Sequence, residues 1–347
     1  MWNLINKTEY VADLIPFLDI DGAETVVAVV KATYTLKPEN PELPLSLTEK
    51  QVPLTFADEY YGDPETSSLH YASDIVPEKQ GTDVVMIGHA YAPHGQAEAI
   101  DVTLATGPLK KTIRVFGDRY WKKSLGRVSI TSPQPFSTMP LIYERAFGGL
   151  DKTHKDPKKW AGEPRNPVGT GLVSNKGRQD LEEISLPNIE DPSALIKSFR
   201  DRPQPAGFGF VTPSWKPRLD YAGTYDEDWK ENRYPLLPLD FDPRFYNSAH
   251  PDLISTEFFR GGELVRVGNA SKKGSLSFKL PNVEVNAEFY IDSVVTKQMC
   301  RLDTVVIEPD EERFVLTWRT KVRCHRKLKY VMGAKLTSRR RVDGQND

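Results

Sequence analysis

Short runs of β-branched and aromatic residues, bounded by Gly, Pro, Asn and Asp, recur along most of the chain. In residues 25–36 (TVVAVVKATYTL) an apolar run gives way to alternation, which places Ala32, Tyr34 and Leu36 on one face. Such alternation is typical of strands, because successive side chains of a strand point to opposite faces. The same features predict strands at residues 83–92, 99–106, 111–117 and 128–131. We therefore expect a mainly β protein with antiparallel sheets, in a β-sandwich or barrel-like arrangement, with long ordered loops and few short helices.

The clearest pair of strands lies near the end of the sequence. Residues 304–307 (TVVI) and 313–319 (RFVLTWR) flank a polar, proline-containing link, EPDEE. A link of this length and composition predicts an antiparallel hairpin. Helical signals are sparse: Asp191 before Pro192 resembles a helix start and predicts a helix over residues 193–202, and residues 226–232 predict a short helical turn.

The segment from Phe147 to Arg260 is dense in Pro, Gly, Trp and Tyr and shows little sustained periodicity. Loops of this length are usually functional or disordered, and the aromatic content favours packed structure. We expect one integrated domain over residues 1–330, with a β-rich part (1–146), the loop-rich aromatic and Arg-rich segment (147–262) and a C-terminal β part with the hairpin (263–330). Residues 331–347 are expected to form a basic tail, which is either a solvated terminal strand and tail or a segment in contact with nucleic acid.

The charge balance narrows the classes of partner. The 347 residues contain 46 Lys and Arg against 48 Asp and Glu, for a net charge of -2. No overall field then draws the chain to nucleic acid or anionic lipid, so neither is expected as a partner. A composition of 39% hydrophobic and 10% aromatic residues favours a folded chain over a disordered one.

Three features of the sequence bear on the compartment. Glu9 and Asp13 interrupt the N-terminal stretch where a secretory signal needs an apolar run, and the densest apolar run, residues 26–30, is far too short to span a membrane. Two cysteines, Cys300 and Cys324, are too few to stabilise a chain of this length through disulfides. These features predict a protein of the reducing cytoplasm.

No metal or cofactor site is expected. His89 and His94 in GHAYAPHG are two candidate ligands, and two ligands do not make a zinc site. Cys324 and His325 are adjacent, and adjacent residues of a strand face opposite ways, which does not suit a nucleophile and its base. We therefore expect no catalytic residue.

A group of carboxylates keeps an enzyme open as an alternative. These residues could supply the acid pair of a carbohydrate-active enzyme on a β scaffold: Asp226, Glu227, Asp228, Asp240 and Asp242. Acidic residues in such loops are equally typical of helix caps and Asx turns.

Arginines interleaved with aromatic residues are the most conspicuous feature. Trp, Tyr and Arg dominate binding energy at protein interfaces, because each covers a large area and keeps a polar group. The residues expected to contact a partner are Arg119, Trp121, Trp215, Arg218, Tyr225, Trp229, Arg233, Tyr234, Phe258, Phe259 and Arg260. The same types of residue could instead pin the long loops to the sheets through stacking and cation–π contacts.

Nine phrases, in this order, resemble a known family, the domain-of-unknown-function family numbered 2169. They cover most of residues 1–320: TDVVMIGHAYAP (82–93), VFGDRYW (115–121), PLIYERAFGG (140–149), NPVGTG (166–171), PAGFGFVTPSWKPR (205–218), AGTYDEDW (222–229), LPLDFDPRFYN (237–247), RGGE (260–263) and DTVVIEPDEERFVLTWR (303–319). Each phrase alone is weak, whereas nine in sequence are specific.

The resemblance implies an adaptor or chaperone of bacterial type VI secretion, which brings a toxic effector to the spike. The implied partners are a secreted effector or its PAAR-like tip protein and the VgrG spike, bound in the bacterial cytoplasm by protein–protein recognition. No catalytic residue and no cofactor come with the resemblance. A structural component of the spike itself is the second alternative.

Overall fold

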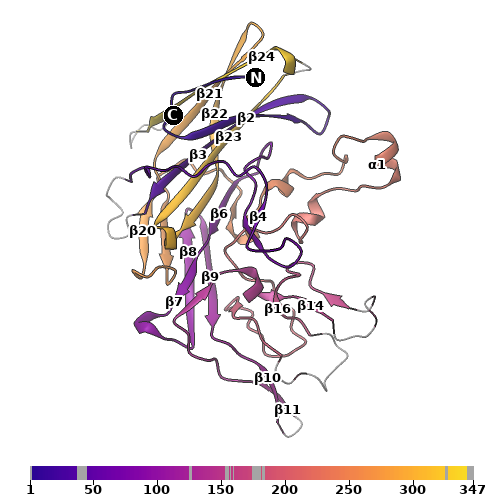
Figure 1. Cartoon of the computed structure of the whole chain (residues 1–347), viewed down its shortest axis with the longest axis vertical. Helices are drawn as coiled ribbons and strands as arrows, with labels where there is room; N and C mark the ends of the chain where they lie inside the picture. Colours follow the sequence, from indigo (N-terminus) through magenta and orange to yellow (C-terminus); the bar gives the residue numbers. More distant parts are fainter. Residues whose placement is uncertain are drawn as a thin grey trace.

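Two large sheets carry the fold of the computed structural model, which describes residues 2–36, 45–124, 127–152, 156, 158, 160–173, 181, 184–324 and 327–341. The first sheet has nine strands and curls into a half-barrel, and the second has five (Figure 1). The predicted mainly β class is therefore confirmed.

The first sheet joins strands from both ends of the chain. Along its main path lie β1 (Asn3–Asn6), β24 (Val331–Arg340), β21 (Val283–Ile291), β22 (Val294–Glu308), β23 (Arg313–Arg323), β3 (Glu24–Thr35) and β2 (Val11–Leu18). The long strand β22 pairs with β21 over its first half and, in parallel, with β6 (Thr82–Met86) over its second half. β18 (Ile254–Ser255) pairs with β6.

Strand β3 explains the unbroken apolar run at the start of the chain. Its residues Val26 and Val30 belong to the main core, whereas Val27 and Val29 pack in a separate cluster with Leu54. Both faces of β3 are therefore covered, and a strand buried on both faces carries apolar residues in succession instead of alternating.

The second sheet is antiparallel and draws on distant segments. Its strands, in order, are β17 (Ile189–Glu190), β9 (Leu109–Phe116), β8 (Ala99–Thr106), β19 (Leu264–Gly268) and β20 (Leu276–Lys279). Val102 of β8 and Val265 of β19 belong to the same core cluster as Val30 of β3. The three parts proposed for residues 1–330 thus share sheets and one main core.

Short elements fill the remaining segments. The two-stranded pairs are β4 (Glu59–Tyr60) with β5 (Leu69–Tyr71), β7 (His89–Tyr91) with β12 (Thr138–Pro140), β10 (Trp121–Ser124) with β11 (Arg127–Ile130), β13 (Phe147–Gly148) with β16 (Thr170–Gly171), and β14 (Leu150–Asp151) with β15 (Ala161–Gly162). Helix α1 (Glu227–Asn232) is accompanied by the 3₁₀ turns η1 (Pro93–Gly95), η2 (Tyr143–Arg145), η4 (Arg218–Tyr221), η5 (Pro243–Tyr246), η6 (Pro251–Leu253), η7 (Pro309–Glu311) and η8 (Leu328–Tyr330). Within the described ranges, no helix has the length and apolar character needed to cross a membrane.

Several predicted elements are confirmed. Strand β8 spans residues 99–106 as expected, and β22 and β23 form the predicted hairpin around η7. The strand expected at residues 83–92 is divided into β6 and β7. Helix α1 begins after Asp226, whose side chain accepts a hydrogen bond from the Trp229 N–H at 2.9 Å.

The helix predicted over residues 193–202 is wrong, because side chains take the backbone donors that a helix would use. Asp191 accepts the N–H of Ser193 at 2.8 Å, as a helix N-cap does, but Glu190 accepts the N–H of Ile196 at 2.7 Å. Asp201 accepts the N–H of Ser198 at 2.8 Å. Such local bonds offer the backbone an alternative to the helical ladder.

The predicted basic tail, residues 331–347, is also corrected. Its first ten residues form β24, which lies between β1 and β21, and residues 342–347 lie outside the described part. Ala334 and Leu336 point into the core. Arg339 and Arg341, the two neighbours of Arg340, bind the carboxylate of Glu284 at 3.0 and 3.2 Å. Alternating burial makes this segment a strand, with its charges on the outer face.

Candidate partner-binding site

The structure divides the eleven predicted contact residues by burial. Five are buried in the fold: Arg119, Trp121, Trp215, Arg218 and Phe259. Three are half-buried, namely Trp229, Arg233 and Phe258, and three are exposed, namely Tyr225, Tyr234 and Arg260. The buried five do not present a surface to a partner and are corrected here to internal contacts.

Arg119 and Trp121 pin a loop to the second sheet. The guanidinium of Arg119 binds the carboxylate of Glu190, donates to the Pro187 carbonyl at 2.8 Å and lies 3.7 Å from the centre of the Phe116 ring. Trp121 packs in a separate small cluster and meets Phe199 edge-on at 6.5 Å. Both residues therefore stabilise loop structure.

Arg218 clamps two neighbouring 3₁₀ turns together. Its guanidinium donates to the carbonyls of Val211 at 2.6 Å and Phe245 at 3.0 Å, and it lies over the Phe245 ring. Burial lowers the pKa of Arg218, but an arginine starts so far above neutrality that the group stays charged. The nearby Trp215 meets Tyr143 edge-on at 5.8 Å.

The three residues near position 259 lie apart from the others in sequence and contact β6, β22 and the Glu263 side chain. The Phe259 N–H donates to Thr82 of β6 at 2.8 Å, and the Arg301 guanidinium covers the Phe258 ring at 5.0 Å. The Arg260 N–H is held by Glu263 at 2.8 Å. Among the described residues, no hydrogen bond, ion pair or ring contact joins this group to the other candidates, although Phe259 and Trp215 belong to the same core cluster.

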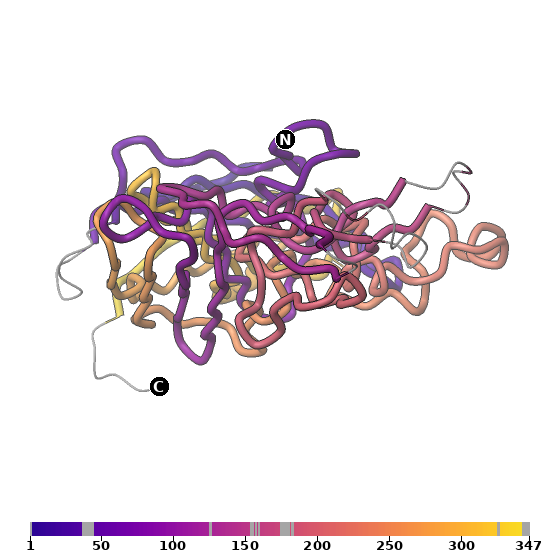
Figure 2. Tube along the Cα trace, turned by 90° about the horizontal axis from the view of Figure 1, so that it is seen from below, coloured from indigo at the N-terminus to yellow at the C-terminus, as the bar shows by residue number. Residues whose placement is uncertain are grey.

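The other four candidates lie together on one projection. Residues 222–240, here called the α1 arm, leave the body between η4 and η5 and return to it. The arm stands out from the side of the molecule in Figure 1 and in the second view of Figure 2. At the root, Asp240 accepts the hydroxyl and the N–H of Thr224 at 2.7 and 3.0 Å, and the Asp242 N–H donates to the Tyr221 carbonyl at 3.0 Å. These bonds close the arm as a loop.

Trp229 forms the centre of the arm. Its indole meets Tyr225 at 4.7 Å and Tyr234 at 5.7 Å, both in edge-on geometry, and its ring N–H donates to the Leu236 carbonyl at 2.8 Å. Edge-on aromatic pairs of this kind are favoured by ring electrostatics. The arm therefore has a small core of its own.

Arg233 braces the arm against the main sheet. It donates to the Leu237 carbonyl within the arm at 2.8 Å and to the carbonyl of Ile20 in the turn between β2 and β3. The Leu236 side chain lies against Gly22 of the same turn, where an added Cβ would come within 3.3 Å of it. The arm is held in one position instead of swinging freely.

Large apolar side chains remain exposed on this braced arm. Tyr225 is 53% exposed, Tyr234 is 70% exposed and Leu239 is 80% exposed. Sequence reasoning missed Leu239, although the run Pro235-Leu236-Leu237-Pro238-Leu239 holds more leucine than a short loop can bury. The exposed residues form the candidate partner-binding surface.

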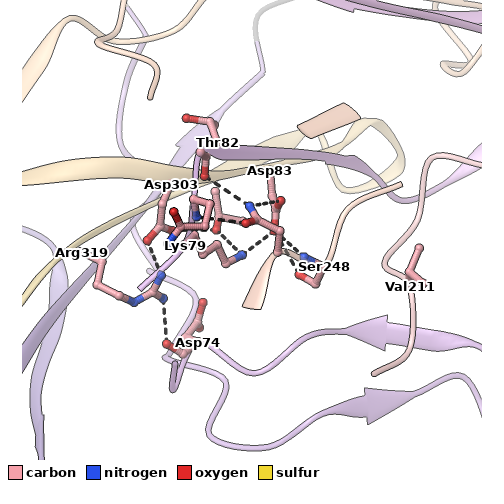
Figure 3. Close-up of polar contacts among 12 residues, drawn as sticks. Asp74, Lys79, Thr82, Asp83, Val211, Ser248, Asp303 and Arg319 are labelled. Carbon is pink, nitrogen blue, oxygen red and sulfur yellow. Dashed lines mark hydrogen bonds and ion pairs between the residues drawn. The ribbon is translucent and has the colours of Figure 1, made fainter. Parts of the chain in front are cut away.

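A buried network of charges is the second conspicuous cluster (Figure 3). Lys79 binds Asp83 at 2.7 Å, and Asp83 also accepts the N–H of Ser248 at 2.8 Å. Arg319 binds Asp303. Burial raises the pKa of Asp303, and the positive charges of Arg319 and Lys79 act in the opposite direction. An adjoining cavity of about 20 Å³ has room for one water. Apart from the buried Nε of Arg319, which has no hydrogen-bond partner among the described residues, these groups bind one another and join β6, β22 and β23, so the network serves the fold.

The carboxylates considered for an enzyme are engaged in local structure. Asp226 caps α1, Asp240 closes the arm, Asp242 accepts the N–H of Arg244 at 2.9 Å, and Asp228 accepts the Asn232 amide at 2.9 Å. They serve as the caps and turns that their sequence context also indicated.

The structure gives neither His89 nor the two cysteines the surroundings of a metal ligand or a nucleophile. His89 binds Asp310 at 2.7 Å, and no group of three or more His, Cys, Asp or Glu suited to a metal occurs among the described residues. Cys300 and Cys324 are buried free thiols, and burial raises the pKa of Cys300 to about 12, which keeps it in the unreactive thiol form. His325, proposed beside Cys324, lies outside the described residues.

Comparison with known proteins gives one match. No curated protein and no solved structure matches the chain. The family model described as "Uncharacterized protein conserved in bacteria (DUF2169)" matches residues 21–319, from the turn before β3 to β23 and including the α1 arm. The match confirms the family that the nine phrases indicated. The chain belongs to the DUF2169 family of bacterial proteins.

Proposed function

We propose that the protein is a cytoplasmic adaptor of bacterial type VI secretion, which binds a secreted effector or its PAAR-like tip protein and helps to load it onto the VgrG spike. The proposal combines the sequence resemblance with one structural observation, the α1 arm. The arm is supported by its own aromatic centre and by Arg233, yet it leaves Tyr234 and Leu239 mostly exposed.

A rigid arm suits recognition because little conformational freedom is lost on binding. Preorganised aromatic anchors give large contact area at low entropic cost. The side chains of Tyr234 and Leu239 each contribute about 2 kcal/mol when fully buried. Their burial at an interface would therefore contribute up to about 4 kcal/mol before the costs of association are subtracted, an upper bound of several hundred-fold in affinity.

The test is co-purification with the products of the neighbouring genes at native levels. Tyr234→Ala with Leu239→Ala removes the two most exposed apolar side chains of the arm and one ring contact of Trp229, so we expect a global melting temperature within about 1 °C of the wild type and about a 100-fold loss of affinity for the captured protein. A matched control is Phe56→Ala with Val294→Ala, which removes two exposed apolar side chains outside the arm. We expect the control to bind as the wild type does.

The pair Trp229→Ala with Arg233→Ala is a less direct test. Both side chains hold the arm together, so their loss acts on the shape of the surface as well as on its contacts. Capture that persists unchanged in the Tyr234 and Leu239 variant would remove the arm from the interface. A fixed, stoichiometric place in purified secreted spikes would instead assign a structural role.

A further inference from the structure

We infer that the partner of the α1 arm presents a cationic protein surface around an apolar pocket, an inference that rests on the proposed function and specifies its partner. The arm has five acidic residues and only two basic ones. The acidic residues are Asp226, Glu227, Asp228, Glu231 and Asp240, and the basic ones are Lys230 and Arg233.

Neither basic residue of the arm adds much positive charge to its outer surface. The Arg233 guanidinium is turned to backbone carbonyls of Leu237 and Ile20. Lys230 lies 3.5 Å from Glu227, as an exposed pair. Such a pair contributes little energy, and it cancels the charge of Glu227 as much as that of Lys230.

The unbalanced carboxylates and the exposed apolar groups occupy the same part of the arm. Asp228 and Glu231 are exposed on α1, and the helix lies between Tyr225 and Tyr234 in the chain. Both tyrosines contact Trp229 of the same helix. A partner that buries the tyrosines must therefore come close to the carboxylates.

Electrostatic complementarity then selects the partner. Two surfaces of opposite sign attract at a distance, and like charges brought together at an interface cost several kcal/mol. Nucleic acid and anionic lipid carry phosphate and are repelled by this arm. A protein surface with Lys or Arg around a pocket for Tyr234 and Leu239 satisfies both the charge and the apolar area.

The basic C-terminal stretch does not share this imbalance. It is matched by carboxylates from other segments: Lys321 with Glu78, Arg323 with Asp21, and Arg339 with Glu284. These charges of that region are paired within the fold, whereas the exposed Asp228 and Glu231 of the arm have no ion-pair partner among the described residues.

A phage-displayed library of random peptides provides a test that needs no natural partner. Peptides are selected on the full-length protein, with counter-selection on the Tyr234→Ala and Leu239→Ala variant. We expect enriched peptides to carry net positive charge together with an aromatic or aliphatic residue. Glu227→Gln, Asp228→Asn and Glu231→Gln combined should weaken their binding about tenfold, as three exposed charge pairs would.

Two controls separate charge from other effects. Glu9→Gln, Glu49→Gln and Glu65→Gln remove the same charge from exposed positions outside the arm and should leave binding within about twofold. Raising NaCl from about 50 to about 300 mM should weaken binding by the wild type and should have a smaller effect on the arm variant.

The outcomes distinguish this inference from the proposed function. Enrichment of neutral or acidic peptides, or binding indifferent to the arm carboxylates, overturns the cationic partner even if a secretion protein is captured. Cationic peptides that bind the arm, combined with no capture of any neighbouring gene product, overturn the secretion role and leave the surface chemistry standing.

Discussion

Arg319 offers the sharpest test of how the core is held together. It lies on β23, is 4% exposed, binds the carboxylate of Asp303 and donates to the Asp74 carbonyl at 2.8 Å. Arg319→Met keeps much of the volume but leaves the fully buried Asp303 without its direct ion-pair partner. We expect this variant to be strongly destabilised.

The magnitude follows from the burial of both groups. Removing one partner of a buried ion pair costs about 3 to 5 kcal/mol, because an uncompensated charge remains in the interior. At about 2.1 cal/mol/K per residue, the unfolding entropy of 347 residues is about 0.7 kcal/mol/K, so the melting temperature should fall by about 4 to 7 °C. Asp303→Leu added to Arg319→Met should recover much of the loss, since no charge is then stranded.

The pH dependence gives a second signature. Burial already raises the pKa of Asp303, and loss of the Arg319 charge raises it further. A carboxyl whose pKa is higher in the folded state takes up a proton on folding, so a fall in pH favours the folded state. The difference in stability between variant and wild type should therefore narrow from about pH 8 to about pH 5.

Calorimetry with a matched variant decides the question. Arg323→Met, four residues along β23, breaks an exposed pair with Asp21, which should cost less than about 1 kcal/mol. If Arg319→Met and Arg323→Met melt within about 1 °C of each other, the buried network does not hold the core as argued here.

Three further predictions concern the arm, the sheet edge and pH. Trp229→Ala should increase amide hydrogen exchange across residues 222–240 and shift the global melting temperature by less than about 1 °C, because it removes the centre of a local unit; protection that stays at the wild-type level would contradict this. Gly333→Ala should lower the urea midpoint, since its Cβ would lie 1.8 Å from the carbonyl oxygen of Asn3 and force β1 away from β24; an unchanged midpoint would show that the edge tolerates the side chain. Burial lowers the pKa of His250 to about 4, so the folded state favours the neutral ring, and about 3 kcal/mol of stability should be lost as the pH falls from about 6.5 to about 4. His250→Asn keeps a helix-capping acceptor and should flatten that part of a urea-denaturation profile, whereas an unaltered slope would refute the assignment.

The local order of apolar and polar residues was sufficient to predict many of the strands. Residues 99–106 alternate because one face of β8 is buried, and the hairpin of β22 and β23 follows from its polar link. Such features depend on neighbours in sequence, which the sequence displays directly. The failed helix after Asp191 shows the limit, because Glu190 and Asp201 captured backbone donors through contacts that helix-start signals do not encode.

The sequence indicated only part of the candidate site. Interleaved arginine and aromatic residues marked the α1 arm, which is exposed, but the same pattern marked Arg119 and Arg218, which are buried. Residue type records what a side chain is able to do, and only its surroundings determine whether it faces a partner or the interior. Leu239, the most exposed large apolar residue of the described chain, carried no such pattern.

By itself the sequence determined the β class, many of the strands and the family, because these depend on residue order over short stretches. Only the tertiary structure decided which charges meet. It brought Asp303 to Arg319, Glu284 to Arg339 and Asp21 to Arg323, and within the part of the chain that the structure describes it left the carboxylates of the α1 arm without ion-pair partners from outside the arm. The physical reason is that an ion pair or an exposed surface depends on distances between segments far apart in the chain, and folding sets those distances through burial of the whole core.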